Sequence, residues 1–436
     1  MKRAVLLLGP LAALILGVSC GGGGNSVTGP NGNVTVNAPS KLTNRAFITN
    51  QYSGNIQIVD SNNDTTAYYN ITNNYTGNST NATSTNGGTP ATAIDIVVGG
   101  SLTLMALRPD NAETVVDNPT SNVLTFIDNA SEASTGSVNL PGRATGLVYS
   151  ADSTKLYVPV PNAPVANNTT PVTYSRPGAV IVIAEPTSTT TVSIKVTVPI
   201  PSAQSVAISP DGNTLLVFAA NSDTMYVIDT TQTTLVPVAY TGFARPVNAF
   251  FGSDSSTAYV INCGPECGST AGPPSVMRFD VASRTVTATV PVGGASVGLL
   301  KNTTLYVAGY PGGSTGTFDV VDVGSMTRTT NNPVAIGDGT HTTMAISNNN
   351  KMYIGALTCA NQTVGCLSIV DLGKTAADPM GSPLGFVTSM QSIPNRDTMY
   401  VIEGGALNIY NTDTGQLQST QISFRGALYG VVQVDQ

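Results

Sequence analysis

The sequence is poor in charged residues, histidine and tryptophan. Charged residues make up only 10% of the 436 residues, tryptophan is absent, and His341 is the single histidine. A single histidine excludes copper, zinc and haem sites that need several imidazole ligands. Acidic residues outnumber basic residues by 25 to 18, and this balance argues against the basic stripes with which proteins bind nucleic acids. The sequence has no phosphate-binding loop and no expected strand-turn-helix elbow of the G-x-S-x-G type, although the bare pattern occurs at residues 294–298 and 312–316.

Long hydrophobic runs are missing after residue 19, so no later segment is expected to span a bilayer as a helix. Residues 1–19 join a basic pair to a short apolar stretch, which is typical of an export signal. The stretch from Leu16 to Cys20 resembles a bacterial lipobox, although Gly17 stands where leucine is usual. The resemblance implies that Cys20 is acylated and anchors the chain to a membrane of the cell envelope. Simple secretion, with an incidental cysteine, is the alternative.

The main positive feature is an internal repeat. Residues 204–240 contain four short apolar strands, and the turn Ser209-Pro210-Asp211-Gly212 separates the first from the second. The apolar anchor of the second strand recurs along the chain, and from Tyr259 to Tyr400 the step is 47 residues three times running. The eight anchors are Phe47, Val115, Tyr157, Leu216, Tyr259, Tyr306, Tyr353 and Tyr400. Four antiparallel strands at a period in the forties predict the blades of a β-propeller.

The third strand of most repeats ends in two apolar residues and an aspartate. These aspartates are Asp60, Asp128, Asp229, Asp280, Asp322 and Asp371, and Ala184 and Asn411 replace them in two repeats. We expect the aspartates to accept backbone N–H bonds at turns. The combination of SPDG, a Leu/Tyr-Val strand and VID resembles the YVTN-type propeller repeat, a relative of WD-repeat blades. The resemblance covers residues 45–436 and implies an all-β propeller, for which we predict eight four-stranded blades, with seven as the alternative.

The chain ends and one insert complete the predicted organisation. Residues 1–19 are the signal peptide, residues 20–44 a flexible Gly/Asn/Thr tether, and residues 45–436 one propeller domain. Residues 61–90 are a low-complexity insert, expected to be a mobile excursion before a fourth strand at residues 93–98. The first repeat lacks a first strand, whereas residues 426–432 have first-strand character. We therefore predict that the C-terminal strand completes blade 1 and closes the ring.

Four cysteines form two close pairs in two loops. Cys263 and Cys267 lie in one loop, and Cys359 and Cys366 in another. In an exported chain such pairs predict two local disulfides. A shared four-cysteine zinc site is the rival, but the pairs belong to blades that are not neighbours. We therefore predict no metal site and no cofactor.

Both cysteine loops join second to third strands, and all such loops emerge on one face of a propeller. The connections between blades open on the same face, and they carry Arg143, Arg245, His341 and Arg425. These four residues are the candidate ligand-binding set, a cationic ring suited to carboxylate or phosphate groups. The alternative is that each arginine pairs with a neighbouring aspartate or caps carbonyl groups.

Two classes of function remain open at this stage. The first is a non-catalytic binding or scaffold propeller, tethered to the cell envelope, which takes a protein or a small anionic ligand on its loop-rich face. The second is a lactonase-like hydrolase that uses Arg143, Arg245 and His341 at the channel mouth. A nucleophile or base within reach of these residues would favour the hydrolase, whereas a channel lined with Ser and Thr would favour the binding protein. The absence of tryptophan argues against propellers with a quinone cofactor.

Overall fold

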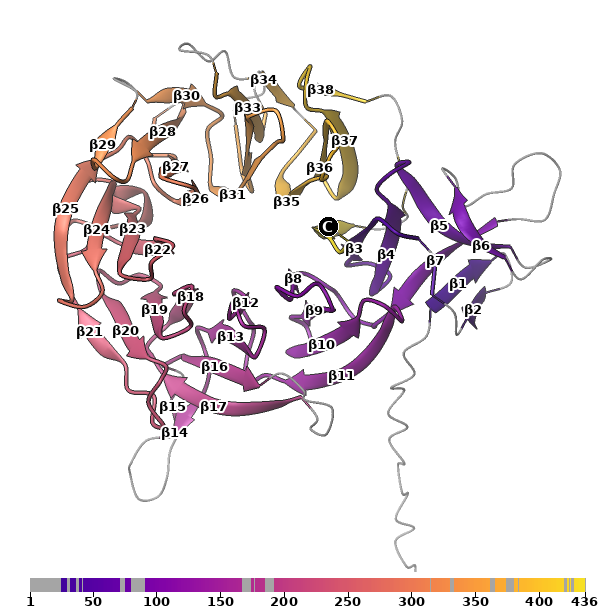
Figure 1. The fold of residues 1–436 in the computed structure, drawn as a ribbon, viewed down its shortest axis with the longest axis horizontal. Coiled ribbons are helices and arrows are strands. Elements are labelled where there is room, and N and C mark those ends of the chain that lie inside the picture. The colour runs from indigo at the N-terminus through magenta and orange to yellow at the C-terminus, as the bar shows by residue number, and fades with distance from the viewer. Residues whose placement is uncertain are drawn as a thin grey trace, which may run out of the picture.

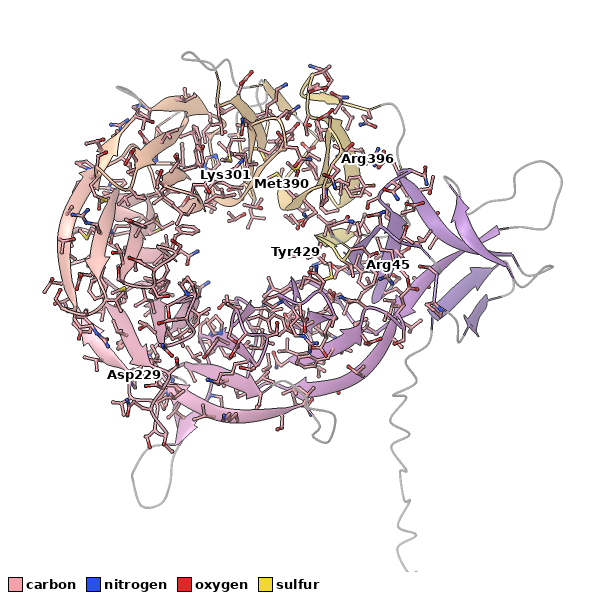
Figure 2. All side chains as sticks on the ribbon, viewed as in Figure 1. Arg45, Asp229, Lys301, Met390, Arg396 and Tyr429 are labelled. Carbon is pink, nitrogen blue, oxygen red and sulfur yellow. A yellow bond between two sulfur atoms is a disulfide. The ribbon has the colours of Figure 1, made fainter. Side chains whose placement is uncertain are left out.

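The structure is a closed ring of eight antiparallel blades (Figure 1). The centre of the ring, the channel, stays open in the view that draws the side chains (Figure 2). It is a computed structural model that describes residues 25–29, 32–36, 39–40, 42–70, 75–79, 91–166, 174–175, 177–184, 192–313, 315–329, 333–360, 365–373, 380–382, 384–418, 422, 424 and 427–435. Each blade has the predicted meander of four strands, numbered here from the channel outward. The all-β fold and the choice of eight blades over seven are confirmed.

The two inner positions of each blade hold the strands closest to the channel. The first strands are, for blades 1 to 8, β39 (Leu428–Gln433), β8 (Met105–Leu107), β12 (Val148–Tyr149), β18 (Ala203–Ile208), β22 (Pro246–Phe251), β26 (Val297–Lys301), β31 (His341–Ile346) and β35 (Val387–Ser392). The second strands are β3 (Arg45–Asn50), β9 (Glu113–Asn118), β13 (Lys155–Val160), β19 (Thr214–Ala219), β23 (Thr257–Asn262), β27 (Thr304–Gly309), β32 (Lys351–Ala356) and β36 (Thr398–Glu403).

The two outer positions vary more in length. The third strands are β4 (Asn55–Asp60), β10 (Val123–Asp128), β16 (Ala179–Ala184), β20 (Met225–Asp229), β24 (Ser275–Asp280), β28 (Gly316–Asp322), β33 (Leu367–Asp371) and β37 (Ala406–Asn411). The fourth strands are β5 (Thr65–Asn70) with β7 (Ala91–Val97), β11 (Ala133–Asn139), β17 (Ser193–Pro199), β21 (Val238–Tyr240), β25 (Thr285–Pro291), β29 (Thr327–Arg328) with β30 (Val334–Ile336), β34 (Met380–Ser382) and β38 (Gln416–Leu417).

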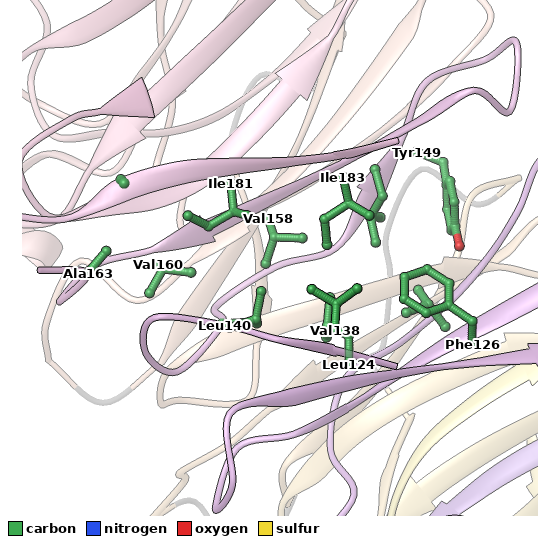
Figure 3. Packing of buried hydrophobic residues seen from close by; sticks show 14 residues of the cluster. Leu124, Phe126, Val138, Leu140, Tyr149, Val158, Val160, Ala163, Ile181 and Ile183 are labelled. Carbon is green, nitrogen blue, oxygen red and sulfur yellow. The ribbon is translucent and has the colours of Figure 1, made fainter. Parts of the chain in front are cut away.

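The hydrophobic core lies between blades rather than within them. In β13, Leu156 and Val158 belong to the cluster shared with blade 2, where Val158 lies near Val138 and Leu140 (Figure 3). Tyr157 belongs to the cluster shared with blade 4. Alternate side chains of a strand point to opposite faces of its sheet, so one strand supplies two interfaces. This explains why the second strands are buried on both faces along most of their length. The buried hydrophobic residues of the described chain form eight clusters, one for each pair of neighbouring blades.

Blade 1 closes the ring as predicted. The C-terminal strand β39 pairs antiparallel with β3 and takes the inner position of that blade. Arg45, at the start of β3, donates hydrogen bonds to Asp435 and to the buried Glu132 of blade 2. Arg396 of blade 8 donates to Asp64 of blade 1, so side chains on both flanks secure the closure (Figure 2).

The structure differs from the sequence-based expectation on the outside of blade 1. Two strands, β1 (Asn25–Gly29) and β2 (Gly32–Val36), form a hairpin that pairs with β7, although they lie in the segment assigned to a flexible tether. Within the insert, β5 and β6 (Tyr75–Ser79) also pair. The expected fourth strand at residues 93–98 is present as part of β7. The division of the chain at residues 19 and 44 stays a prediction, because residues 1–24 lie outside the described ranges.

The repeated aspartates hold turns, as the sequence predicted. Asp229 accepts a hydrogen bond from the backbone N–H of Thr231 at 3.0 Å, and Asp280 accepts one from Ser283 at 2.7 Å. In the SPDG turn, Asp211 accepts a bond from the backbone of Asn213, and Gly212 has φ 74°. These carboxylates satisfy their own backbone, so they form no repeated functional site.

Candidate functional site

The ring has two different faces. The loop face consists of the loops between second and third strands and the connections between blades. The turn face consists of the tighter turns between first and second and between third and fourth strands. Both cysteine pairs lie on the loop face and are disulfide-bonded, with Cα–Cα distances of 5.6 Å for Cys263–Cys267 and 5.4 Å for Cys359–Cys366. The predicted pairing is therefore confirmed, and local disulfides indicate an oxidising environment.

The loop that contains Cys263–Cys267 bridges three blades. A 3-10 turn, η1 (Gly264–Cys267), begins after the first cysteine. The hydroxyl group of Ser269 donates to Asp223 of blade 4 at 3.0 Å, and Glu266 accepts a bond from the backbone N–H of Tyr310 in blade 6 at 2.8 Å. The disulfide and these contacts fix the loop above the channel mouth.

The loop that contains Cys359–Cys366 is held in a similar way. The backbone N–H of Ala360 donates to both carboxylate oxygens of Asp338, at 3.0 and 3.2 Å. Asp338 belongs to the connection between blades 6 and 7, and the backbone N–H of Leu357 bonds to Thr340 in the same connection. Both disulfide loops are therefore fixed to the connections that surround the mouth.

Arg245 lies at the mouth, but its guanidinium group is used within the protein. Its Nε donates to the Cys267 carbonyl at 3.1 Å, and Nη2 donates to the Gly268 carbonyl at 3.4 Å. Its backbone N–H donates to Asp223 at 2.9 Å, and the Asp223 carboxylate lies 4.0 Å from Nη1. These contacts match the alternative in which the arginine caps carbonyl groups and pairs with a neighbouring aspartate.

His341 is a buried core residue. It begins β31, where it pairs with Ala356, and only 2% of its surface is exposed. The residues with the same register in other blades are Ala203, Pro246, Val387 and Leu428. Burial lowers the pKa of His341 to about 4, against the effects of a hydrogen bond to the Gly337 backbone and the charge of Asp338. The imidazole is therefore neutral at pH 7 and supplies no cation to the mouth.

Of the other two residues in the predicted cationic ring, the structure describes only Arg143. Arg143 is exposed in the connection between blades 2 and 3, where its charge acts on Asp117. Arg425 and the predicted lipidation site Cys20 lie outside the described residues. Within the part of the chain that is described, Arg143 is therefore the one predicted cation that faces solvent, and a four-residue cationic ring is not assembled.

Asp117 was not singled out from the sequence. Its side chain is fully buried at the end of β9, where Thr103 donates to Oδ2 at 3.2 Å. Burial raises the pKa of Asp117 to about 6, although the Thr103 bond and the charge of Arg143 oppose this shift. Asp95 in β7 is similar: burial raises its pKa to about 6, although Asn55 and Gln57 donate to it. No motif marks either residue, because each depends on packing within its blade.

Hydroxyl groups link neighbouring blades around the channel. At five interfaces, a Ser or Thr hydroxyl group donates to a backbone carbonyl near the start of the next inner strand. One acceptor is Tyr429, which lies on the inner side of the ring (Figure 2). The bonds join Thr49 to Thr103 (3.3 Å), Thr145 to Gln204 (2.7 Å), Ser205 to Val247 (2.5 Å), Ser296 to His341 (3.2 Å) and Thr388 to Tyr429 (2.6 Å). Thr49 is fully buried and the other four donors are partly buried, so these hydroxyl groups serve as contacts between blades.

Two cavities lie away from the mouth. A groove of about 540 Å³ on the inner strands of blades 3 to 6 has a mainly apolar lining that includes Ile208, Phe250 and Leu300. A pocket of about 460 Å³ at the rim of blade 4 includes Val236, Val238 and Arg284. The described residues contain no group of three His, Cys, Asp or Glu side chains placed to hold a metal ion, and no helix among them is long and apolar enough to cross a membrane.

The sequence matches no protein-family model and no curated protein. In structure, the chain is similar to the dihydro-heme d1 dehydrogenase NirN solved in complex with DHE, with a TM-score of 0.65 and 11% identity over 92% of this chain and 78% of that one. It is also similar to a functionally unknown protein from Desulfotomaculum acetoxidans, with a TM-score of 0.53 and 14% identity over 89% of this chain and 98% of that one. A third similar structure is the Cps50 (Swd1) β-propeller domain of Myceliophteria thermophila, with a TM-score of 0.50 and 9% identity over 70% of this chain and 94% of that one. At these identities the similarities show the fold alone: the chain is a β-propeller.

Proposed function

We propose that this protein is a non-catalytic binding or scaffold propeller, held at the bacterial cell envelope by a lipid on Cys20, that presents its loop face to a protein partner. The observation that carries the proposal is the fixation of the described parts of two disulfide-bonded loops on one face. Disulfides and bonds to neighbouring blades hold the loops at 263–274 and around Cys359. Rigid loops on a rigid scaffold present a preorganised surface, which lowers the entropy cost of binding.

A protein partner fits the site better than a small anion does. An anion site at the mouth would need several free cations, but Arg245 is bonded to its own loop and His341 is neutral. Arg143 alone is exposed among the described candidates. A single exposed arginine in a chain of net charge −7 gives weak selection for carboxylate or phosphate groups.

The finer assignments in this proposal come from the sequence. The SPDG and VID motifs support membership of the YVTN-type repeat family, and the stretch from Leu16 to Cys20 supports lipidation. The hydrolase alternative has no support from the site, because the only histidine of the chain is buried and neutral. A general base must reach its substrate, and this side chain does not.

Site-specific photo-crosslinking tests the binding face. A photoreactive phenylalanine analogue is placed at Asn162 or Thr270 on the loop face, and at Thr234 or Thr303 on the turn face; these four residues are exposed. In cells that export the full chain, the loop-face positions should give discrete crosslinked products and the turn-face positions should not. Crosslinks from the turn face alone, or from neither face, would refute the proposal.

Membrane fractionation tests the anchor separately. The wild-type protein should sediment with membranes, and Cys20→Ser or inhibition of the lipoprotein signal peptidase should release it. An unchanged distribution in the Cys20→Ser variant would remove the anchor from the proposal without affecting the binding face.

A further inference from the structure

Four large side chains with extensive apolar surface are exposed on the loop face, in neighbouring blades. Tyr52 follows β3 in blade 1 and is 86% exposed; Leu384 and Phe386, in the connection between blades 7 and 8, are 47% and 46% exposed. Leu357, which follows β32 in blade 7, is 37% exposed. We call these four residues the apolar sector. Isolated exposed apolar residues are ordinary, whereas a group of them on one face indicates an interaction site.

Backbone contacts join the loops that carry the apolar sector. The Phe386 carbonyl accepts a bond from Gly404 at 2.9 Å, in the adjoining loop of blade 8. Gly405 in that loop accepts a bond from Leu428 at 2.9 Å, and Ala427 accepts one from Gln51 at 2.8 Å, next to Tyr52. These bonds connect the described parts of the loops in blades 8 and 1 across the closure of the ring.

Leu357 adjoins these loops through blade 7. It lies two residues beyond Gly355, where any added Cβ would meet Val387 at 2.5 Å, which shows how closely blade 8 approaches at this point. Glycine therefore permits the contact between β32 and β35. Leu357 and Phe386 are held on adjoining blades by this close packing.

Charge separates the loop face from the turn face. Among the described residues, the loops of the loop face carry charge at Arg143, Asp223, Arg245, Glu266 and Asp338, and all but Arg143 are wholly or partly buried. None of the five lies in the loops of the apolar sector. The turn face presents exposed carboxylates at Asp110, Asp152, Asp211, Asp254, Asp397 and Asp413. The turn face therefore has the charged side chains of a solvent-exposed surface. The apolar sector has the uncharged composition of a protein interface.

We propose that the apolar sector docks an uncharged segment of a protein partner, anchored by aromatic or branched aliphatic side chains. The inference rests on the proposed function and names the partner chemistry for that face. Any charge on the bound segment would lose water without gaining a counter-charge from the sector, which costs several kcal/mol. Interface cores are depleted in charge and enriched in aromatic residues, and Tyr52 and Phe386 fit that composition.

A protein fits the sector better than a membrane does. Binding to anionic headgroups is driven by lysine and arginine, and the described loops of the sector contain neither. The Phe386 carbonyl and the Gln51 N–H form hydrogen bonds to neighbouring loops, and the Tyr52 N–H donates to the Asn50 side chain at the base of its own loop. The sector is thus a fixed surface, whereas insertion into lipid needs an apolar face presented along an element.

Selection from a phage-displayed library of random dodecapeptides on the purified full-length protein tests the proposal. The enriched peptides should carry aromatic or aliphatic residues without charge. Their affinity, measured by fluorescence anisotropy, should fall at least tenfold for the Leu384→Ser/Phe386→Ser variant. It should be unchanged for Val236→Ser/Val238→Ser, because these residues are 61% and 47% exposed at the rim of blade 4. Tyr52→Ser, at the most exposed position, serves if the first variant does not fold.

Several results would overturn the inference. They are enrichment of charged peptides, no enrichment at all, or equal binding by the sector variant and the rim variant. Sedimentation with phosphatidylcholine or phosphatidylglycerol vesicles that is lost in the sector variant would assign the sector to lipid. A dimer in analytical ultracentrifugation that is lost in that variant would assign it to a second copy. If the crosslinks from Asn162 or Thr270 persist in the Leu384→Ser/Phe386→Ser variant, this inference is wrong, although the proposed function remains supported.

Discussion

Arg45 and Asp435, 390 residues apart in the sequence, are joined by two side-chain hydrogen bonds of 2.7 Å. The same guanidinium group donates to Glu132 at 2.9 Å and to the Asn129 carbonyl at 2.6 Å. Burial disfavours the charge on Arg45, but its bonds to Asp435 and Glu132 outweigh this effect and raise its pKa. One side chain thus connects the end of β39, the start of β3 and a turn of blade 2.

Removal of this arginine should weaken ring closure. Arg45→Ala deprives the buried Glu132 carboxylate of its cation, so we expect a loss of about 3–5 kcal/mol in the free energy of unfolding. Asp435→Ala leaves the Glu132 contact in place and should cost about 1–3 kcal/mol. Urea denaturation measures both values. Asp397→Ala, on an exposed turn, is the control and should change stability by no more than about 0.5 kcal/mol; equal effects for all three variants would contradict the role of Arg45.

Deletion of residues 427–436 should open the ring. The deletion exposes the inner edge of β3 and removes Leu428 and Val431 from the cluster between blades 8 and 1. An unpaired strand edge promotes association between chains, so the truncated protein should aggregate. Size-exclusion chromatography with light scattering measures this, with Asp435→Ala as the control that retains β39. A truncated chain that remains monomeric and melts at the wild-type temperature would refute closure by β39.

Asp117 should lower stability as the pH rises. Its pKa is raised from 3.8 to about 6 in the folded state, so the fold binds its proton more tightly than the unfolded chain does. The stabilisation is complete below about pH 4 and is lost as the pH rises through 6. Asp117→Asn should therefore gain stability relative to wild type between pH 4 and pH 7, by up to about 3 kcal/mol. Urea titrations at both pH values measure the gain, and Asp397→Asn should show none.

His341 should have the opposite pH dependence. Its folded pKa of about 4 lies below the ordinary 6.5, so its contribution is present above pH 6.5 and is lost as the pH falls towards 4. As the only histidine of the chain, it alone gives the imidazole C–H signals in the NMR spectrum, and these should not titrate between pH 7.5 and 5.5. A midpoint near 6.5 in the folded protein would show instead that the side chain is accessible and restore it as a candidate cation.

Arg245 should protect one disulfide selectively. Arg245→Ala removes the bonds to the Cys267 and Gly268 carbonyls, so the loop should open more often. Reduction of Cys263–Cys267 by dithiothreitol should accelerate about tenfold, the effect of losing about 1.4 kcal/mol. Cys359–Cys366 is the internal control, because Arg245 makes no contact with it. Mass spectrometry of alkylated peptides follows both bonds, and unchanged rates for the first would show that the loop does not depend on Arg245.

The fold could be predicted because its determinants are local and repeated. The anchor positions of Tyr157, Tyr353 and Tyr400 are buried between blades, as their apolar surroundings implied. The disulfides were predictable because each pair is separated by only 4 or 7 residues. The first repeat lacks a first strand, and the C-terminal segment has the character of one. These two observations together predicted the pairing of β39 with β3.

The chemistry of the mouth could not be predicted, because it depends on register and loop conformation. His341 is buried because it precedes a bulge in β31 and so takes the place that Val387 takes in blade 8. Arg245 meets carbonyl groups that only the folded loop after Cys263 brings within reach. Tyr52 and Phe386 are far apart in the sequence, and ring closure alone places the loops that carry them on adjoining blades.

Because every hydrophobic cluster is shared by two blades, the protein has no terminal repeat. In an open solenoid, unfolding begins at an end repeat, which has a single neighbour. Here the loss of any one blade breaks two interfaces and leaves two apolar flanks in water. Amide hydrogen exchange in the second strands should therefore proceed through one global opening at a uniform rate around the ring, including the blades whose sequence repeats are degraded.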